Sequence, residues 1–311
     1  MCRLFGLSAS PHRVHATFWL LDAPDSLADQ SRRNPDGTGL GYFAPDDAPV
    51  LDKQPLAAFR DPAFAREARH VSSMQFMSHV RFATTGQKAV QNCHPFAIDG
   101  RIFAHNGALG GLGELEAQIG EDMSNVHGET DSERFFALVS KEIRARGGDV
   151  AAGLQAAVRW IAANLPVSSL NCLLATANEL WAFRYPERHR LLVLERPGGG
   201  RHGDRDLHYA SHVLRVHSAH LSERPSVVVA SEPLDDSSDW RPLASGELLH
   251  VDRDLNVSSR LLIDRPPAHS LRFPPHRVRD LARELAYRGS ADLRHWRAES
   301  VGARRPRAQK S

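Results

Sequence analysis

Cysteine at position 2 is the residue of this sequence whose type and place most directly suggest chemistry. Removal of Met1 would leave Cys2 with both a thiol and a free α-amino group. An α-amine has an ordinary pKa of about 7.7–8.0, so it can take the thiol proton near neutral pH and later return it to a leaving amine. This arrangement predicts acyl transfer by a nucleophile that carries its own base. The alternative is that Cys2 is a small hydrophobic residue without a chemical role.

Polar residues at the ends of two expected strands could complete such a site. Arg81 ends a strand-like run, and a guanidinium can hold a carboxylate with two parallel hydrogen bonds. Asn106-Gly107 places a side-chain amide beside a backbone N–H that no Cβ obstructs, and the pair could donate to a tetrahedral oxyanion. The same dipeptide is also typical of a plain turn. Asp131 opens a strong helix, where it either caps the helix or holds a substrate ammonium group.

A metal site is the competing use for the cysteines and histidines. Cys2, Cys93-His94 and Cys172 could supply ligands, but their spacing matches neither a C-x₂-C nor an H-x₃₋₅-H pair. We therefore expect no metal and no cofactor. The remaining histidines near the motifs, His79 and His105, are expected to form structural hydrogen bonds, as is His94.

The predicted elements are mixed α and β, followed by mostly β. The apolar run over residues 3–9 predicts a strand that begins almost at the terminus. Helical spacing of apolar residues predicts four helices, over residues 13–23, 61–71, 132–146 and 150–164. Thr130 or Asp131 is the expected N-cap of the third. From residue 166 on, short β-like runs separated by turn signals lack βαβ alternation, which favours an α+β fold with antiparallel sheets.

Composition limits the class of protein. With 311 residues, 41% of them hydrophobic and 24% charged, the chain has the makeup of a globular protein. No apolar run reaches the about 18 residues of a membrane helix, and the first residues do not form a signal peptide. Three cysteines cannot build a disulfide framework. We therefore expect a cytoplasmic protein that does not associate with membranes.

The end of the chain differs from the rest. Residues 264–275 contain four prolines and predict a linker, residues 276–288 could form one amphipathic helix, and residues 300–311 are expected to be disordered. Residues 271–311 hold 11 Arg and Lys against four Asp and Glu. Nucleic-acid binding is the alternative reading of such a tail, but its acidic residues alternate with the arginines, which favours a solvated extension.

Six short motifs occur in a fixed order along the chain. They are Cys2, Arg33–Gly39 (RNPDGTG), His79–Thr84 (HVRFAT), Cys93–Phe96 (CHPF), His105–Gly107 (HNG) and Glu129–Glu133 (ETDSE). Together they resemble the glutaminase domain of the class II glutamine amidotransferases, which are N-terminal-nucleophile hydrolases. The resemblance implies a four-layer αββα sandwich of two antiparallel sheets over residues 2–263, with residues 264–311 as the linker and tail.

The resemblance also implies a role for each matching residue. Cys2 would be the nucleophile, with its own α-amine as the base. Asn106 and Gly107 would form the oxyanion hole. Arg81 would bind the substrate α-carboxylate, and Asp131 would bind its α-amino group. Thr84 would line the glutamyl pocket, and Arg33 would steady the loop near the nucleophile. Phe82 and Thr85 depart from the residues that many members carry, Trp and His, which puts the amide preference in question rather than the thiol chemistry.

The function that this resemblance implies is hydrolysis of glutamine or of another γ-glutamyl amide through a thioester on Cys2. Only about 50 residues follow the domain, too few for an ammonia-accepting domain, so a stand-alone amidase is expected. One alternative is a glutaminase subunit that passes ammonia to a separate synthase. The other is a catalytically silent binding or regulatory module. The expected ligand is a small molecule rather than nucleic acid.

Overall fold

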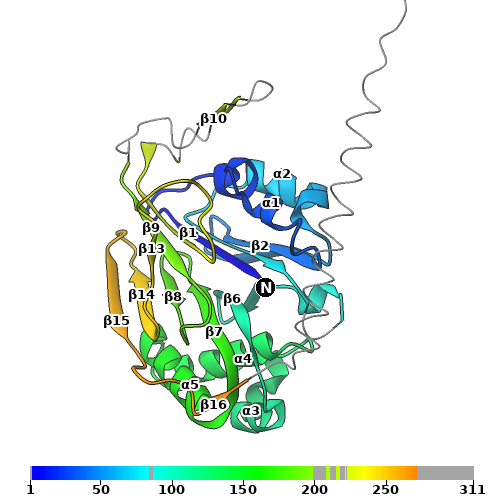
Figure 1. The fold of residues 1–311 in the computed structure, drawn as a ribbon, viewed down its shortest axis with the longest axis vertical. Coiled ribbons are helices and arrows are strands. Elements are labelled where there is room, and N and C mark those ends of the chain that lie inside the picture. The colour runs from blue at the N-terminus through cyan, green and yellow to red at the C-terminus, as the bar shows by residue number, and fades with distance from the viewer. Residues whose placement is uncertain are drawn as a thin grey trace, which may run out of the picture. The chain divides into compact units, whose positions relative to one another are not determined.

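The computed structural model describes residues 2–83, 87–198, 208–210, 215–217, 221 and 223–271, and its compact unit ends at Leu271. Two sheets and two sets of helices make up this unit (Figure 1). Within the described residues, no helix combines the length and the apolar character that crossing a bilayer requires.

The first sheet carries the amino-terminal strand at its centre. Its strand order is β13-β9-β12-β1-β4-β2-β3, and every pairing is antiparallel. In β1, Arg3 pairs with Val80 of β4, and Phe5 pairs with Ala230 of β12. The strands are β1 (Arg3–Ser8), β2 (Gly37–Phe43), β3 (Pro49–Gln54), β4 (Gln75–Arg81), β9 (Leu192–Arg196), β12 (Ser226–Ala230) and β13 (Arg241–Pro242). The strand predicted at the start of the chain is therefore confirmed.

The second sheet has the order β15-β14-β8-β7-β6-β5, again antiparallel, and the short β16 adds to β7 in parallel. Its strands are β5 (Phe96–Ile98), β6 (Arg101–Leu109), β7 (Pro166–Ala175), β8 (Leu180–Phe183), β14 (Glu247–Val251), β15 (Val257–Leu261) and β16 (His269–Ser270). A separate hairpin consists of β10 (His208–Ala210) and β11 (Arg215–His217).

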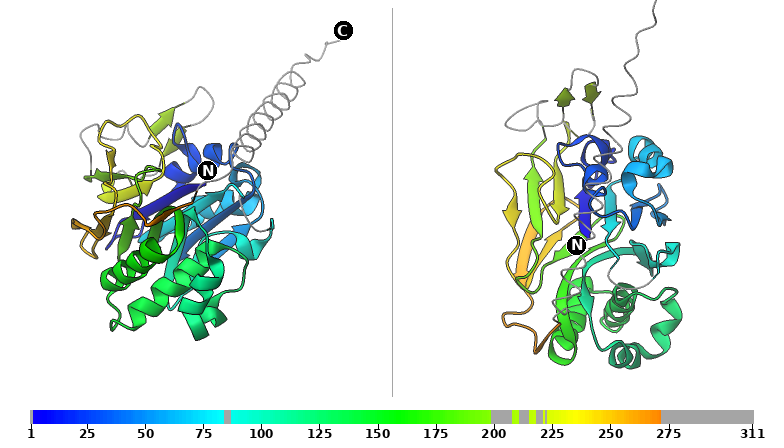
Figure 2. Two further views of the ribbon diagram at one scale, coloured as in Figure 1. Left: turned by 60° about the horizontal axis from the view of Figure 1, so that its bottom comes forward. Right: turned by 45° about the vertical axis from the view of Figure 1, so that its right-hand side comes forward.

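Helices cover the outer face of each sheet (Figures 1 and 2). The first sheet carries η1 (Phe18–Asp22), α1 (Leu27–Gln30), η2 (Ala58–Arg60) and α2 (Pro62–His70). The second carries α3 (Leu112–Ile119), η4 (Gly120–Asn125), α4 (Asp131–Arg144) and α5 (Val150–Asn164), while η3 (Val90–Asn92) lies in the loop before β5. The inner faces of the sheets pack on each other, with Leu4 and Met77 from one sheet in a core with Leu173 and Leu180 from the other. The predicted αββα sandwich is confirmed.

The two long helices begin where capping residues satisfy their first N–H groups. Thr130 Oγ accepts a hydrogen bond from Glu133 N–H at 3.2 Å, and Asp149 accepts one from Ala152 N–H at 2.9 Å. Of the two predicted caps of α4, the structure thus selects Thr130 and leaves Asp131 in the first turn.

The prediction of a helix over residues 13–23 was wrong. Only Phe18–Asp22 form a helical turn, whereas Val14 makes a strand-like bridge with Ser73. Val14 and Phe18 are nevertheless buried, so their helical spacing reflected two separate contacts with one core.

Residues 264–271 contact the sandwich closely. Ala268 N–H donates to Ala162 O at 2.8 Å, Leu271 N–H donates to Val167 O at 2.9 Å, and the Tyr185 hydroxyl donates to Arg265 O at 3.1 Å. The helix predicted over 276–288 and the disorder predicted over 300–311 lie outside the described residues.

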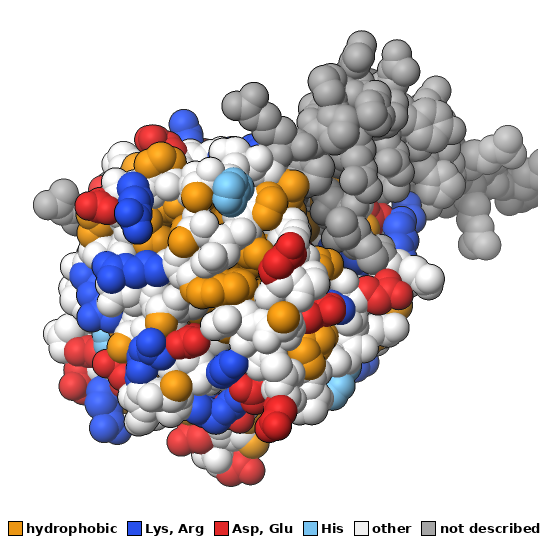
Figure 3. Space-filling model, turned by 90° about the horizontal axis from the view of Figure 1, so that it is seen from below, with side chains coloured by type: hydrophobic (Ala, Val, Ile, Leu, Met, Phe, Trp, Pro, Cys, Tyr) orange, Lys and Arg blue, Asp and Glu red, His pale blue; other side chains and the backbone are white. Residues whose placement is uncertain are grey.

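On the face that includes this end of the sandwich, basic and acidic side chains are interspersed (Figure 3).

Candidate active site

Cys2 lies at the end of the first sheet, immediately before β1. Continuing the β1–β4 register by one residue places it opposite Arg81, beside Phe82. Phe82 N–H donates to Cys2 Sγ at 3.3 Å, and the thiol itself lies 3.5 Å from Phe82 O. Cys2 is partly exposed, in contrast to the other two cysteines, which are buried. The sulfur is therefore held at a fixed position against the backbone of Phe82.

Asn106 reaches this position from the second sheet. Its side chain points to the inner face of the sandwich, as those of Ile102 and Ala104 do earlier on β6. Asn106 Nδ2 donates to Cys2 O at 2.9 Å and lies 3.5 Å from Ser231 Oγ. Ser231 Oγ in turn accepts a hydrogen bond from Leu4 N–H at 3.0 Å. Both sheets thus contribute to the surroundings of Cys2.

Gly107 follows Asn106 in a position that excludes any side chain. A Cβ at Gly107 would come within 1.9 Å of Ser169 O. The direction of its N–H follows from its partner on β7, because the two residues of an antiparallel pair either both point their N–H groups at each other or both point them away. Gly107 pairs with Leu170, and Leu170 N–H donates away from β6, to Tyr185 O at 2.6 Å. Gly107 N–H therefore points away from β7, as does Leu109 N–H, which donates to Asp131.

Asp131 is buried at the first turn of α4, and its carboxylate is tied to two elements. Oδ2 accepts the hydrogen bond from Leu109 N–H at 2.7 Å, and Oδ1 accepts one from Ser132 N–H at 3.0 Å. Ser132 Oγ also lies 3.4 Å from Oδ1, so Oδ2 is the carboxylate oxygen that can accept a second hydrogen bond.

Arg81 is buried at the end of β4 and is linked to the segment before Asp131. One terminal nitrogen of Arg81 donates to Gln87 O at 3.0 Å, and Asn92 Nδ2 donates to the same oxygen at 3.1 Å. Asn92 Oδ1 accepts from Glu129 N–H at 2.8 Å, and the Glu129 carboxylate accepts from Gln87 N–H at 3.2 Å. This chain of hydrogen bonds fixes Arg81 relative to the loop that leads into Asp131.

Asn92 was not predicted as a site residue. Its side chain joins two loops, from Gln87 O to Glu129 N–H, and the sequence gives no sign of that contact. Asp36 is a second such residue: its carboxylate accepts from Ala83 N–H at 3.1 Å and pairs with Lys88 at 2.5 Å. Both residues stand inside or beside the quoted motifs. Their near-complete burial, rather than their type, identifies them as structural supports of the site.

Arg33 and Thr84 complete the predicted set. Arg33 is exposed, lies 3.2 Å from Asp25 and 3.9 Å from Glu232, and Glu232 binds Arg3 at 2.6 Å. Arg33 is thus connected to β1 through two ionic contacts rather than directly. Thr84 lies outside the described residues.

Burial governs the protonation of the thiol and of the nearby histidines. Burial raises the pKa of the Cys2 thiol, and the hydrogen bond from Phe82 and the charge of Arg81 oppose this shift only in part. Burial also lowers the pKa of His105, while Asp131 opposes that shift. His105 Nε2 donates to Ser169 O at 3.0 Å, and its Nδ1 lies 2.9 Å from Ser132 Oγ. The expectation of structural hydrogen bonds thus holds for His105, whereas the ring nitrogens of His79 and His94 are buried without a hydrogen-bond partner among the described residues.

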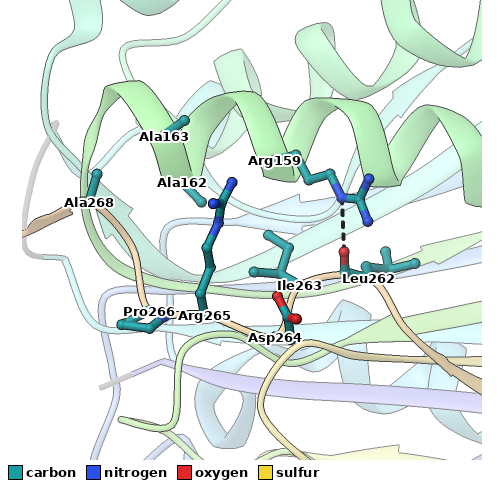
Figure 4. Close-up of a pocket in the computed structure, with 9 residues that line it drawn as sticks. All are labelled: Arg159, Ala162, Ala163, Leu262, Ile263, Asp264, Arg265, Pro266 and Ala268. Carbon is teal, nitrogen blue, oxygen red and sulfur yellow. Dashed lines mark hydrogen bonds between the residues drawn. The ribbon is translucent and has the colours of Figure 1, made fainter.

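Two cavities are relevant to ligand binding. One, of about 380 Å³, includes Asn106, which contacts Cys2, and is lined by Arg3, Asn106, Arg188, His189, Arg190, Leu192, Ser231, Glu232 and Pro233. Another, of about 420 Å³, lies between α5 and residues 262–268, where Arg159 donates to Leu262 O at 3.0 Å (Figure 4). The second cavity holds none of the predicted site residues. Among the described residues, no group of His, Cys, Asp and Glu is arranged to hold a metal ion.

Comparison with known proteins agrees with this fold. The model of the class II glutamine amidotransferases matches residues 1–266, so the chain belongs to this family. An uncharacterized protein of Methanocaldococcus jannaschii is 29% identical over 95% of this chain and 82% of its own length. The gamma-glutamyl-hercynylcysteine sulfoxide hydrolase of Mycolicibacterium smegmatis is 26% identical over 83% of this chain and 98% of its own length. A solved glutamine aminotransferase class-II domain protein from Silicibacter pomeroyi superposes with a TM-score of 0.55, at 20% identity, over 85% of this chain and all of its own.

Proposed function

We propose that the protein hydrolyses the side-chain amide of glutamine, or another γ-glutamyl amide, through a γ-glutamyl thioester on Cys2. The observation that carries this proposal is the meeting of a partly exposed Cys2 with the amide of Asn106 from the opposite sheet. The hydrolase from M. smegmatis supports hydrolysis in particular, because its name describes cleavage of a γ-glutamyl compound and its length matches this domain.

Cys2 acts as the nucleophile once Met1 has been removed. Since burial raises the pKa of its thiol, the sulfur is protonated near neutral pH and needs a base. The α-amine of the same residue accepts the proton as sulfur attacks the amide carbon. The resulting ammonium then protonates the nitrogen as the C–N bond breaks. Water, deprotonated by the same amine, hydrolyses the thioester and releases the γ-carboxylate.

Asn106 Nδ2 and Gly107 N–H stabilise the negative oxygen of the tetrahedral intermediate. Nδ2 carries two hydrogens: one donates to Cys2 O at 2.9 Å, and the other makes a long contact of 3.5 Å with Ser231 Oγ, which it exchanges for the oxyanion of the intermediate. Gly107 presents its N–H at the edge of β6 that Asp131 also occupies. Such preorganised donors contribute about 2.7–4 kcal/mol each in enzymes where they have been removed.

Arg81 and Asp131 hold the two charged groups of the substrate. The guanidinium binds the α-carboxylate, and the carboxylate binds the α-ammonium group. The hydrogen-bond chain through Gln87, Asn92 and Glu129 fixes the distance between these two contacts. Fixed contacts at both groups orient the γ-amide toward Cys2.

The test is hydrolysis of glutamine and of γ-glutamyl-p-nitroanilide by the purified protein and by Cys2→Ala. We expect Cys2→Ala to lose at least about 1,000-fold in turnover and to keep its unfolding midpoint, because the residue is small and partly exposed. Cys172→Ala is the matched control, since that thiol lies on β7, buried between the second sheet and its helices, and should not affect turnover. Turnover by Cys2→Ala equal to that of the unaltered protein would exclude the proposal.

A further inference from the structure

The 380 Å³ cavity lies where the departing amine of a γ-glutamyl amide bound at Cys2 would be expected. In the first sheet, β1 lies between β4 and β12. Arg81 ends β4 on one side of Cys2, whereas Ser231 follows β12 on the other side and lines the cavity. Asn106 also lines the cavity and donates to the carbonyl oxygen of Cys2, so the cavity lies one residue away from Cys2. If the γ-glutamyl group lies on the Arg81 side, the departing amine lies in this cavity.

The cavity is strongly basic. Arg3, Arg188 and Arg190 line it, and Glu232 is the acidic residue of the lining. Glu232 is bound to Arg3 at 2.6 Å, so it offsets that charge and leaves those of Arg188 and Arg190. Burial and the charge of Arg188 lower the pKa of His189 to about 4, so its imidazole is neutral near pH 7. The net charge of the lining is therefore positive.

Buried polar side chains hold the loop that carries these arginines. Arg184 is buried and donates to His189 O at 2.8 Å and to Glu187 O at 2.9 Å. Asn171 is fully buried, and its Nδ2 donates to His189 O at 3.2 Å and to Arg190 O at 3.3 Å. These hydrogen bonds from buried side chains fix the backbone of the loop and therefore the positions from which Arg188 and Arg190 extend.

Asn171 also connects this loop to the catalytic strand. It is the residue of β7 that pairs with Asn106 of β6. One strand pair thus positions both the proposed oxyanion donor and the loop with Arg188 and Arg190. The two cationic side chains are exposed at the rim, where they can reach a ligand. Arg188 donates to Leu271 O at 3.3 Å and to Ser168 Oγ at 3.4 Å, which leaves Arg190 as the main candidate for an anion contact.

We propose that the physiological leaving amine carries a carboxylate, as in a γ-glutamyl dipeptide, and that Arg190, assisted by Arg188, binds this carboxylate. This inference rests on the proposed function and narrows its substrate class. The chemistry of the step is unchanged: the γ-amide C–N bond breaks, and the released amino acid leaves with the proton from the α-ammonium of Cys2. Ammonia, the leaving group of glutamine, would make no use of the arginines.

The experiment compares two substrates of nearly equal shape, γ-glutamylglycine and γ-glutamylglycinamide. We expect kcat/KM to be at least about tenfold higher for the carboxylate than for the amide, and the ratio to fall toward one in Arg190→Gln. The ratio should also decrease as salt is added, since the arginines are exposed. Both kcat/KM values are measured on the same protein, so a variant that is partly unfolded or less active overall lowers both values equally and leaves their ratio unchanged. Arg260→Gln, an exposed arginine on β15 away from the cavity, should retain the ratio of the unaltered protein.

The outcomes separate this inference from the proposed function. Equal hydrolysis of the two substrates would overturn the inference and leave the amidase activity intact. A high ratio that persists in Arg190→Gln and in Arg188→Gln would overturn the assignment to these arginines. Failure to cleave either substrate or glutamine, with a folded protein, would overturn the proposed function and the inference together.

Discussion

Asn106 is the residue of the second sheet that contacts Cys2, the nucleophile that we propose. Its amide bridges to the carbonyl of Cys2 in the free protein and is the donor that we assign to the intermediate. A contact that strengthens only as the oxyanion forms should affect turnover more than substrate binding.

Asn106→Ala should therefore lower kcat by about 100- to 1,000-fold and leave KM within about twofold. Asn164→Ala is a suitable control, because that asparagine lies at the exposed end of α5. Steady-state hydrolysis of glutamine measures both constants. A rise in KM at unchanged kcat would assign Asn106 to substrate binding instead.

Four residues of the candidate site could be predicted from the sequence because of their residue types. Cys2, Arg81, Asn106 and Asp131 have side chains whose chemistry is informative alone, and their motifs occur in the order of the family. Asn92 could not be identified in this way, because its amide connects Gln87 O to Glu129 N–H across two loops. Such contacts depend on how distant segments pack, which no local pattern encodes.

At the scale of elements, buried histidines mark the space between β4 and the loop before β5. The rings of His79 and His94 lie 4.2 Å apart, and both are almost fully buried. Burial and, to a smaller extent, the charge of Arg81 together lower the pKa of His79 to about 3. The unfolded chain binds a proton at His79 near pH 6.5, whereas the folded protein does not until about pH 3.

This difference makes stability depend on pH. The contribution of a neutral His79 is fully present above about pH 6.5 and is lost as the pH falls below it, because only the unfolded state gains protons there. Between pH 7 and pH 5, His79 alone should account for a loss of about 2 kcal/mol in the free energy of unfolding. Urea unfolding of His79→Gln should show that much less dependence on pH than the unaltered protein. Identical pH dependence in the two proteins would show that folding does not shift the pKa of His79.

The elements themselves were predictable to different degrees. Residues 150–164 form a helix with the predicted bounds, because a capping aspartate precedes a long amphipathic pattern. The helix α3 was not predicted, since Gly110, Gly111 and Gly113 signal a turn at its start. Gly111 has a φ of 67°, which glycine adopts at little cost, and the helix begins directly after it. Packing of Leu115 and Ile119 against the second sheet outweighs the low helix propensity of the glycines.

At the scale of the whole molecule, the compact unit ends at Leu271. The prolines at 266 and 267 suggested a linker from residue 264 on, but β16 pairs with β7 and Ala268 contacts α5. Proline is compatible with an extended segment on a surface, so its presence alone does not distinguish a linker from an edge strand.

A chain that ends after Leu271 should therefore unfold at the same temperature as the full chain to within about 2 °C and retain glutamine hydrolysis. A chain that ends after Ile263 should unfold several degrees lower, because it loses the hydrogen bonds of Ala268 and Leu271 to the sandwich. Calorimetry of the three proteins tests this boundary. Equal midpoints for both truncated chains would show that residues 264–271 contribute little.

The most direct test of the whole account is the mass of the mature protein after reaction with 6-diazo-5-oxo-L-norleucine, a glutamine analogue that alkylates a nucleophile at the position of the amide. The account predicts a chain without Met1 that gains one adduct, located by peptide sequencing on Cys2, with glutamine slowing the reaction. A chain that retains Met1, or an adduct on Cys93 or Cys172 instead, would contradict it.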